Sequence, residues 1–201
     1  MRTLLLATVA MFAVATSANA MDFNLGVQGG YGSSESDLSN AFHGESYSVD
    51  SEGWILGGFA GVDWDMGPGW SLGVEGDYNW TDAEGDILGF HPYTIEQSSN
   101  ASVRARVAFD IASNTELFGS LGMAWADVDV ISGGCAGCDT GIDTLEGWTG
   151  GIGLERQYTG WFGRIEYRYT AYDDDDFSHS GSPASVDLAT HALLLGAGWT
   201  M

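Results

Sequence analysis

The 201-residue sequence contains no lysine, three prolines and two cysteines, and no long apolar run follows its first twenty residues. Six arginines against 28 acidic residues give a formal net charge of −22, which repels nucleic acid, so we expect no nucleic-acid partner. The lack of an apolar run of about 18 residues argues against a transmembrane helix. Thirty glycines argue against long helices of any kind, because a glycine inside a helix costs about 1 kcal/mol relative to alanine.

The first twenty residues carry the pattern of a cleaved secretory signal. Met1-Arg2 gives a positive start, residues 4–14 are apolar, and Ala18-Asn19-Ala20 is a small-x-small ending. The apolar run is shorter than the roughly 20 residues that a spanning helix needs. We therefore expect a signal peptide over residues 1–20 and one exported domain over residues 21–201.

Apolar and polar residues alternate with the period of 2 that indicates β-strands. Eight segments show this alternation, at residues 22–32, 54–65, 70–81, 101–110, 116–128, 147–157, 161–171 and 189–200. Each is close to the roughly 9–11 residues of a tilted strand that crosses a membrane. The connections alternate between tight turns and long polar stretches, which is typical of an outer-membrane barrel.

The two faces of these predicted strands differ in a way that argues against a soluble sandwich or a lipocalin. One face is rich in Gly, Ser, Asn, Asp, Glu and Arg, too polar for a soluble core. The other is apolar and ends in aromatic residues such as Trp80, Tyr167 and Trp199, as in the girdles at bilayer interfaces. Because an unpaired backbone group in hydrocarbon costs several kcal/mol, such strands must close on themselves. The sequence predicts an all-β fold, an eight-stranded antiparallel up-and-down transmembrane β-barrel.

Five segments in order resemble the porin-like outer-membrane β-barrel family of alphaproteobacterial surface antigens. They are LGVEGDYNWTD (72–82), SVRARVAFD (102–110), LFGSLGMAW (117–125), GWTGGIGLE (147–155) and RIEYRYTAY (164–172). The resemblance implies an OmpA-like transmembrane domain in the bacterial outer membrane, assembled with the help of the barrel-assembly machinery. Members usually end in phenylalanine, which that machinery reads, whereas this chain has Met201 there and keeps Trp199 as a nearby outward aromatic.

Charged residues on the polar face are predicted to point into the lumen. They are Glu75, Asp77, Arg104, Arg106, Glu155, Arg164, Glu166 and Arg168. Two interpretations stay open: a network of ion pairs that fills the barrel, or the lining of a narrow, selective channel. The alternation turns Arg156 outward, where we expect it at the level of the lipid headgroups, and we expect Tyr172 at the outer interface.

The long polar connections are strongly acidic and contain no arginine. One of them holds a run of four aspartates, a weak candidate for binding divalent cations through carboxylate oxygens. The run consists of Asp173, Asp174, Asp175 and Asp176. No EF-hand spacing is present, so a dedicated metal site is not supported. We expect outer-membrane lipid and lipopolysaccharide as partners, with divalent cations bridging the acidic loops to lipopolysaccharide phosphates.

Cys135 and Cys138 lie in another of these connections, and three interpretations stay open for them. In an exported protein they would form a short disulfide within the loop, which is the state we expect. The alternatives are a free or transient thiol pair and a metal site, although a zinc site would need two further ligands.

The four histidines offer little support for catalysis. His43, His91 and His179 fall in the long connections, and His191 opens the last predicted strand. We expect no enzyme and no cofactor. We expect a monomer with a structural and surface-interaction role in the cell envelope. A narrow porin-type channel is the alternative, and a receptor for haemin, a ligand linked to relatives in the resembled family, is a third.

Overall fold

The computed structural model describes residues 21–40, 46–87, 93–132, 142–172, 177–179 and 182–201, and almost all of them lie in β-strands. The strands are β1 (Met21–Asn40), β2 (Ser46–Gly67), β3 (Trp70–Ile87), β4 (Tyr93–Ala112), β5 (Thr115–Ser132), β6 (Ile142–Gln157), β7 (Phe162–Tyr172), β8 (Phe177–His179) and β9 (Ser182–Thr200). Along the described residues there is no helix with the length and apolarity of a membrane span.

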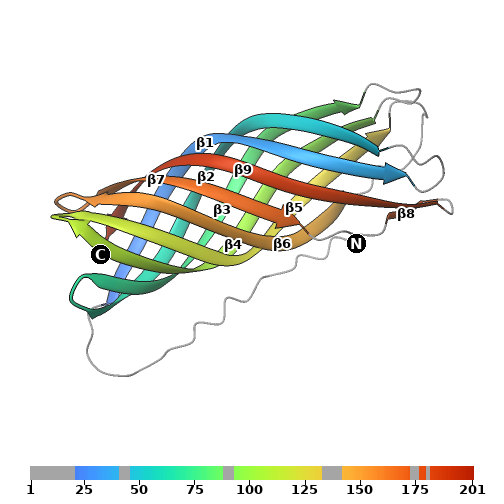
Figure 1. Ribbon diagram of the computed structural model, residues 1–201. Coiled ribbons are helices and arrows are strands. Elements are labelled where there is room, and N and C mark those ends of the chain that lie inside the picture. Colours follow the sequence, from blue (N-terminus) through green and yellow to red (C-terminus); the bar gives the residue numbers. More distant parts are fainter. Residues whose placement is uncertain (1–20, 41–45, 88–92, 133–141, 173–176, 180–181) are drawn as a thin grey trace, which may run out of the picture.

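Eight of these strands form a closed barrel. From β1 to β7 each strand pairs antiparallel with the next, β7 pairs with β9, and β9 pairs back with β1. The three-residue β8 pairs with the start of β9 and takes no part in the ring. Figure 1 shows the resulting elongated, twisted barrel. The predicted fold class is confirmed.

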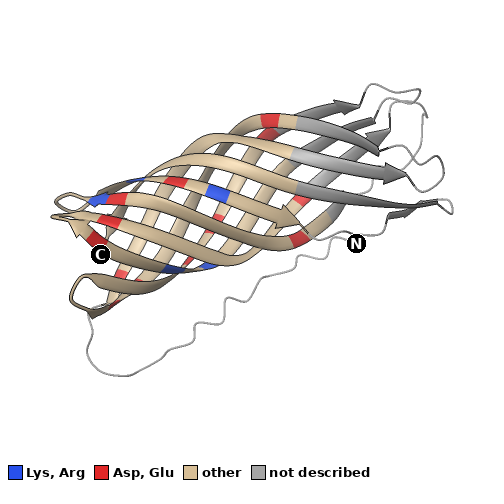
Figure 2. Cartoon of the chain, viewed as in Figure 1, with Lys and Arg blue, Asp and Glu red and all other residues tan. Residues whose placement is uncertain are grey.

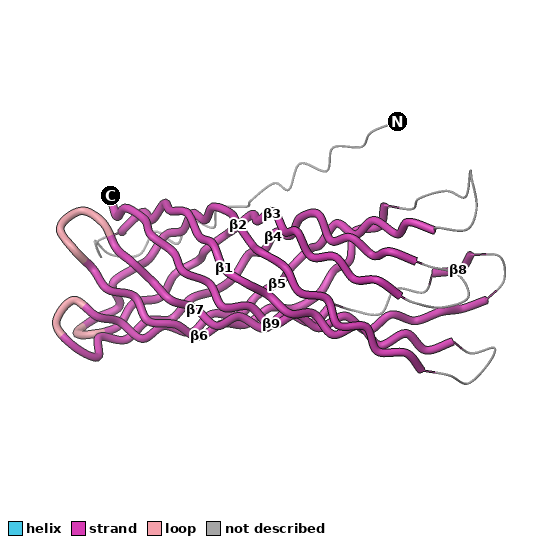
Figure 3. Tube along the Cα trace, turned by 90° about the horizontal axis from the view of Figure 1, so that it is seen from above, coloured by secondary structure: helices cyan, strands magenta, loops and turns pink. Residues whose placement is uncertain are grey.

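Short connections gather at one end of the barrel, which we call the turn end (Figure 3). The opposite end, toward which the strands extend into the long connections, is the loop end. At the turn end Gly69 and Gly160 have φ of 81° and Asn114 has φ of 62°, the left-handed conformation that tight turns require. The backbone N–H of Tyr158 donates to the carbonyl of Trp161 at 2.8 Å and closes the turn between β6 and β7.

The strands extend further toward the loop end than the sequence predicts. β2 has 22 residues and begins at Ser46, whereas alternation indicated a start at residue 54. Its pairing with β1 continues without a break to Ser39 and Ser46. Apolar alternation identifies only the part of a strand with one apolar face, but the backbone ladder needs no apolar side chain to continue.

The outer face of the barrel is apolar, as the alternation predicts. Leu121 and Leu195 on this face are 63% and 62% exposed. Aromatic side chains pack against each other toward the loop end of the same face, with the rings of Tyr31 and Trp54 5.4 Å apart in a T-shaped contact. Such a surface is stable only when lipid covers it.

Tyr172 is an exception to the prediction. It was expected at the outer interface, but its side chain is 7% exposed and packs with Ala124, Ala126 and Leu145 inside the barrel. The alternation from Arg164 onward puts Tyr172 on the same face as the arginines of β7, so its aromatic character was a poorer guide than its position.

Glycines on the inner face make room for long polar side chains. A Cβ on Gly151 would overlap the carboxylate of Glu166 and lie 3.0 Å from the Ser120 hydroxyl. A Cβ on Gly73 would likewise overlap the Asp63 carboxylate. The high glycine content therefore fits the large charged side chains in the lumen.

Two neighbouring glycines of β6 test this explanation. Gly151→Val should destabilise the refolded barrel by about 1–3 kcal/mol, because the new side chain overpacks the lumen against Glu166. Gly150 faces outward, where a Cβ would meet its nearest atom at 3.5 Å, so Gly150→Val serves as the matched control. Urea unfolding in detergent should separate the two variants, and equal midpoints would contradict the explanation.

Candidate functional site

β7 shows how the sequence fills the lumen. Arg164, Glu166 and Arg168 occupy alternate positions, and all three side chains are buried, whereas Ile165 and Tyr167 between them are exposed on the outer face. Figure 2 shows that among the described residues acidic positions outnumber basic ones. Four of the five described arginines lie inside the barrel, where they neutralise some of these acids.

The first group of charges lies midway along the lumen, and we call it the mid-lumen cluster. It consists of Glu75, Asp77, Arg104, Arg164, Glu166 and Arg168. Arg104 donates to Glu75 at 2.6 Å and Asp77 at 3.0 Å, and also pairs with Glu166.

The other two arginines of the mid-lumen cluster share these acids. Arg164 donates to Glu75 at 2.5 Å, and Arg168 donates to Asp77 at 3.0 Å and to Glu166 at 3.1 Å. Each carboxylate therefore binds two or more guanidinium groups, the charge-assisted geometry that buried arginines require.

The second group lies nearer the turn end, and we call it the turn-end cluster. Arg106 donates to Asp63 at 2.8 Å and to Glu155 at 3.0 Å, and lies 3.6 Å from Glu116. Asp63 also accepts from the amide of Asn24 at 2.6 Å. Three acids share one arginine here, whereas three acids share three arginines in the mid-lumen cluster.

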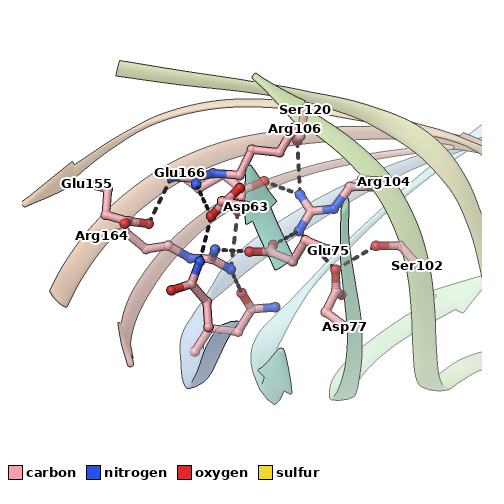
Figure 4. A network of polar contacts seen from close by, with 12 residues as sticks. Asp63, Glu75, Asp77, Ser102, Arg104, Arg106, Ser120, Glu155, Arg164 and Glu166 are labelled. Atoms are coloured by element: carbon pink, nitrogen blue, oxygen red, sulfur yellow. Dashed lines mark hydrogen bonds and ion pairs between the residues drawn. The ribbon is translucent and has the colours of Figure 1, made fainter. Parts of the chain in front are cut away.

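All eight residues predicted for the lumen are buried, and they divide between the two clusters. Figure 4 labels all of them except Arg168. The sequence interpretation missed Asp63 and Glu116. Asp63 lies between the outward Val62 and Trp64, so the alternation itself contained the signal. Polar uncharged partners were missed as well: Gln28 accepts from Arg164 at 2.9 Å, and Ser102 donates to Asp77 at 2.6 Å.

Three phenylalanines on the inner face pack among the guanidinium groups. The Cζ atom of Arg164 lies 3.6 Å from the centre of the Phe59 ring, and that of Arg106 lies 4.7 Å from the centre of the Phe118 ring. Phe59 and Phe162 contact each other, with ring centres 6.0 Å apart. Cation–π contacts of this kind stabilise a desolvated arginine by up to about 2 kcal/mol. The aromatic rings thus contribute to holding the charges in place.

Toward the loop end the lumen contains apolar side chains together with uncharged polar ones such as Thr149 and Thr170. Ile55, Ala192 and Leu194 form one buried group, and the residues around Tyr172 form a second. A cavity between these groups and the mid-lumen cluster, lined in part by Asn79 and Thr149, has a volume of about 20 Å³. That is room for about one water molecule.

At the turn end the lumen widens into a cavity of about 440 Å³, lined by residues of the turn-end cluster and by Asp22, Asp65 and Asp110. The described residues hold no group of three His, Cys, Asp or Glu side chains that could bind a metal ion.

Several predicted features fall outside the described residues. They are the signal peptide over residues 1–20, the cysteines Cys135 and Cys138, the cation candidates Asp173, Asp174, Asp175 and Asp176, and the histidines His43 and His91. The disulfide and the cation site therefore stay predictions. His191 is described: it is exposed, and its Nδ1 shares a hydrogen bond of 2.7 Å with the hydroxyl of Tyr167.

A closed antiparallel barrel with an apolar outer face and a charged interior defines a protein of the bacterial outer-membrane barrel class. Residues 4–200 match the family described as the outer membrane protein beta-barrel domain, and the chain belongs to that family. It is located in the outer membrane, where its strands cross the lipid.

The chain is also similar in sequence to outer-membrane proteins of Brucella and Rhizobium. The chain is 30% identical over 155 residues to the 25 kDa outer-membrane immunogenic protein of Brucella abortus, an alignment that covers 76% of this chain and 68% of the relative. It is 31% identical over 157 residues to the 22 kDa outer membrane protein of Rhizobium leguminosarum, with 76% and 69% covered. The resemblance to alphaproteobacterial surface antigens is confirmed.

Solved structures of outer-membrane proteins are also similar to this chain. The crystal structure of Ail from Yersinia pestis in complex with the heparin analogue sucrose octasulfate aligns with a TM-score of 0.49 at 15% identity. The alignment covers 89% of this chain and 99% of that one.

The contribution of the mid-lumen cluster to stability can be tested by removing one charge while keeping the shape of the side chain. Glu166→Gln removes one of the two carboxylates that Arg104 and Arg168 share in this buried site, the other being Asp77, and should cost about 3–5 kcal/mol of stability. Glu146 is exposed, so Glu146→Gln should change stability by less than about 0.5 kcal/mol. Urea midpoints of the two refolded variants provide the measurement. A Glu166→Gln barrel as stable as the wild type would show that the cluster does not hold the lumen together.

Proposed function

We propose that this protein is a non-enzymatic structural and surface protein of the outer membrane, with a filled lumen that does not conduct and a loop end that presents acidic segments to the exterior. The observation that carries the proposal is the sequence of layers in the lumen. Three arginines and three acids are paired to each other across the middle of the barrel, and apolar and uncharged polar side chains pack on their loop-end side.

A solute passing through the lumen would have to break these contacts. Arg104 is 1% exposed and Glu166 is also 1% exposed, so neither charge faces a continuous column of water. Separating a buried ion pair leaves uncompensated charges, at a cost of several kcal/mol. An ion that crossed this layer would then meet a space of only about 20 Å³ between apolar side chains such as Ile55 and uncharged polar ones such as Thr149.

The alternative function is a narrow channel that opens when the ion pairs rearrange. The cavity of about 440 Å³ supports only the entrance of such a channel, because it extends from the turn end to the turn-end cluster. A channel would require Arg104, Arg164 and Arg168 to leave their shared acids together. The shared pairing of these arginines favours the filled lumen.

Planar bilayer recording of the refolded protein tests the proposal. The wild-type barrel should give no stable openings over the voltage range in which a wide porin, measured as the positive control, conducts. Circular dichroism and protection from protease should show that the inserted protein is folded. Frequent, stable openings from the folded barrel would reject the filled lumen and support the channel.

The proposal includes lipopolysaccharide as a partner of the monomer, bound through divalent cations. At the loop end Glu52, Asp82 and Glu146 are exposed, and the described arginines lie elsewhere. Carboxylate oxygens are the ligands that Ca²⁺ and Mg²⁺ prefer, and the phosphates of lipopolysaccharide offer the opposite side of a bridge. The support is chemical: both surfaces are anionic, so a cation between them lowers their repulsion.

Chelation of divalent cations provides the measurement. In liposomes that contain lipopolysaccharide, addition of EDTA should lower the thermal midpoint of the barrel by several degrees, and Mg²⁺ should restore it. Liposomes of phosphatidylcholine serve as the control, in which neither addition should matter. If EDTA leaves the thermal midpoint unchanged in both kinds of liposome, cation bridging is not part of the function.

A further inference from the structure

The outer wall at the turn end carries one arginine among the described residues, Arg156. The other four described arginines, at positions 104, 106, 164 and 168, are buried in the lumen, whereas Arg156 is exposed on the outer face of β6. It lies two residues before the turn that joins β6 to β7.

Arg156 has no carboxylate partner among the described residues, although the chain contains 28 acids. Its contact is with the ring of Tyr158, whose centre lies 5.8 Å from the arginine Cζ atom. An exposed guanidinium in an acidic protein would ordinarily find a carboxylate. The acids of this end, such as Glu116 and Glu155, point instead to the other side of the wall.

A rigid aromatic pair stands beside Arg156. The rings of Tyr158 and Trp161 are stacked, with centres 4.2 Å apart and planes at 11°. The backbone hydrogen bond between the same two residues fixes their separation. Both side chains are close to half exposed, so the pair forms a flat wall that faces the membrane interface, where Tyr and Trp are favoured.

The residues next to Arg156 around the barrel wall have short side chains. Across the ladder Arg156 pairs with Gly163 on one side and with Thr115 on the other, and Gly163 pairs with Ala197 of β9. These neighbours are small. The ring of Trp161 lies over Gly163, 3.7 Å from where a Cβ would stand, so a headgroup at Arg156 would contact that ring while its acyl chains lie over the exposed Ala197.

We propose that Arg156, with the stacked Tyr158 and Trp161, binds the phosphate of an anionic phospholipid in the leaflet that surrounds the turn end. A guanidinium binds phosphate oxygens through two parallel N–H groups, and the aromatic pair holds the headgroup at the interface. In outer-membrane barrels the short turns face the periplasm, so the ligand is a phospholipid of the periplasmic leaflet rather than the lipid A of the opposite leaflet.

This site is distinct from the lumen, and the inference holds whether or not the barrel conducts. It also differs from the cation bridges proposed for the loop end, because it uses a positive charge on the protein and needs no metal ion.

Native mass spectrometry of the folded barrel tests the proposal directly. The protein is equilibrated in detergent with equal amounts of phosphatidylglycerol and phosphatidylcholine that carry the same acyl chains. The wild type should retain about fivefold more phosphatidylglycerol, the effect expected of one arginine near an anionic lipid. Arg156→Gln should retain the two lipids equally, and Trp161→Ala should lower the retention of both.

Controls make each outcome decisive. Trp70 is an exposed tryptophan of the same end on β3, a different strand from Arg156, so Trp70→Ala should keep the wild-type preference. Arg156→Gln is expected to remain folded because the side chain is exposed, and its far-ultraviolet circular dichroism and urea midpoint should match the wild type.

Equal retention of the two phospholipids by the wild type, or an unchanged preference in Arg156→Gln, would overturn the proposal. Purified lipid A in a parallel titration distinguishes the leaflets: retention of lipid A that depends on Arg156 would overturn the assignment to the periplasmic leaflet.

Discussion

Every backbone N–H and C=O in the membrane-spanning wall must find its partner in a neighbouring strand, because hydrocarbon offers none. The closing seam between β1 and β9 meets that requirement along almost the full length of both strands. Closure fixes the diameter, and an eight-stranded barrel is just wide enough for side chains to fill. The pairing of the charges in the middle of the lumen is a consequence: inward side chains there have no water column to enter, so they must satisfy one another.

The arrangement of charges in the lumen follows from this need for pairing and from the small number of arginines in the chain. Arginine is scarce, and four of the five in residues 21–201 lie inside, where each contacts at least two acids. Phenylalanine rings pack on the guanidinium planes, and glycines leave room for the longest side chains. The fifth arginine is on the lipid side, which is why its surroundings are aromatic rather than acidic. Position in the wall, more than residue type, determines what each charge contacts.

The sequence predicted the fold and the contents of the lumen because both depend on a period of 2. Ile165 and Tyr167 face lipid, so alternation alone assigns Arg164 and Glu166 to the lumen. Their partners depend on how the strands are staggered around the ring. Arg164 donates to Glu75, which is 89 positions away along the chain, and no local pattern specifies that pair. The prediction put Tyr172 at the outer interface because its aromatic character was given more weight than its position in the alternation of β7. The loop-end extensions of the strands were missed because polar residues on both faces leave no alternation to detect.

The seam between the first and last strands also has a kinetic consequence. Phe23 and Met201 exchange two backbone hydrogen bonds of 3.0 Å and 2.9 Å, and Asn24 accepts from the hydroxyl of Thr200, 176 positions away. The contacts that complete the ring are therefore among the most distant in the chain, and contacts of that kind form slowly because a large loop must close first. Until they form, β1 and β9 each present an unpaired edge together with an apolar face. The barrel thus has no stable half-built form in lipid, because a chain interrupted before Ser182 would lack β9 and leave β1 and β7 with open edges.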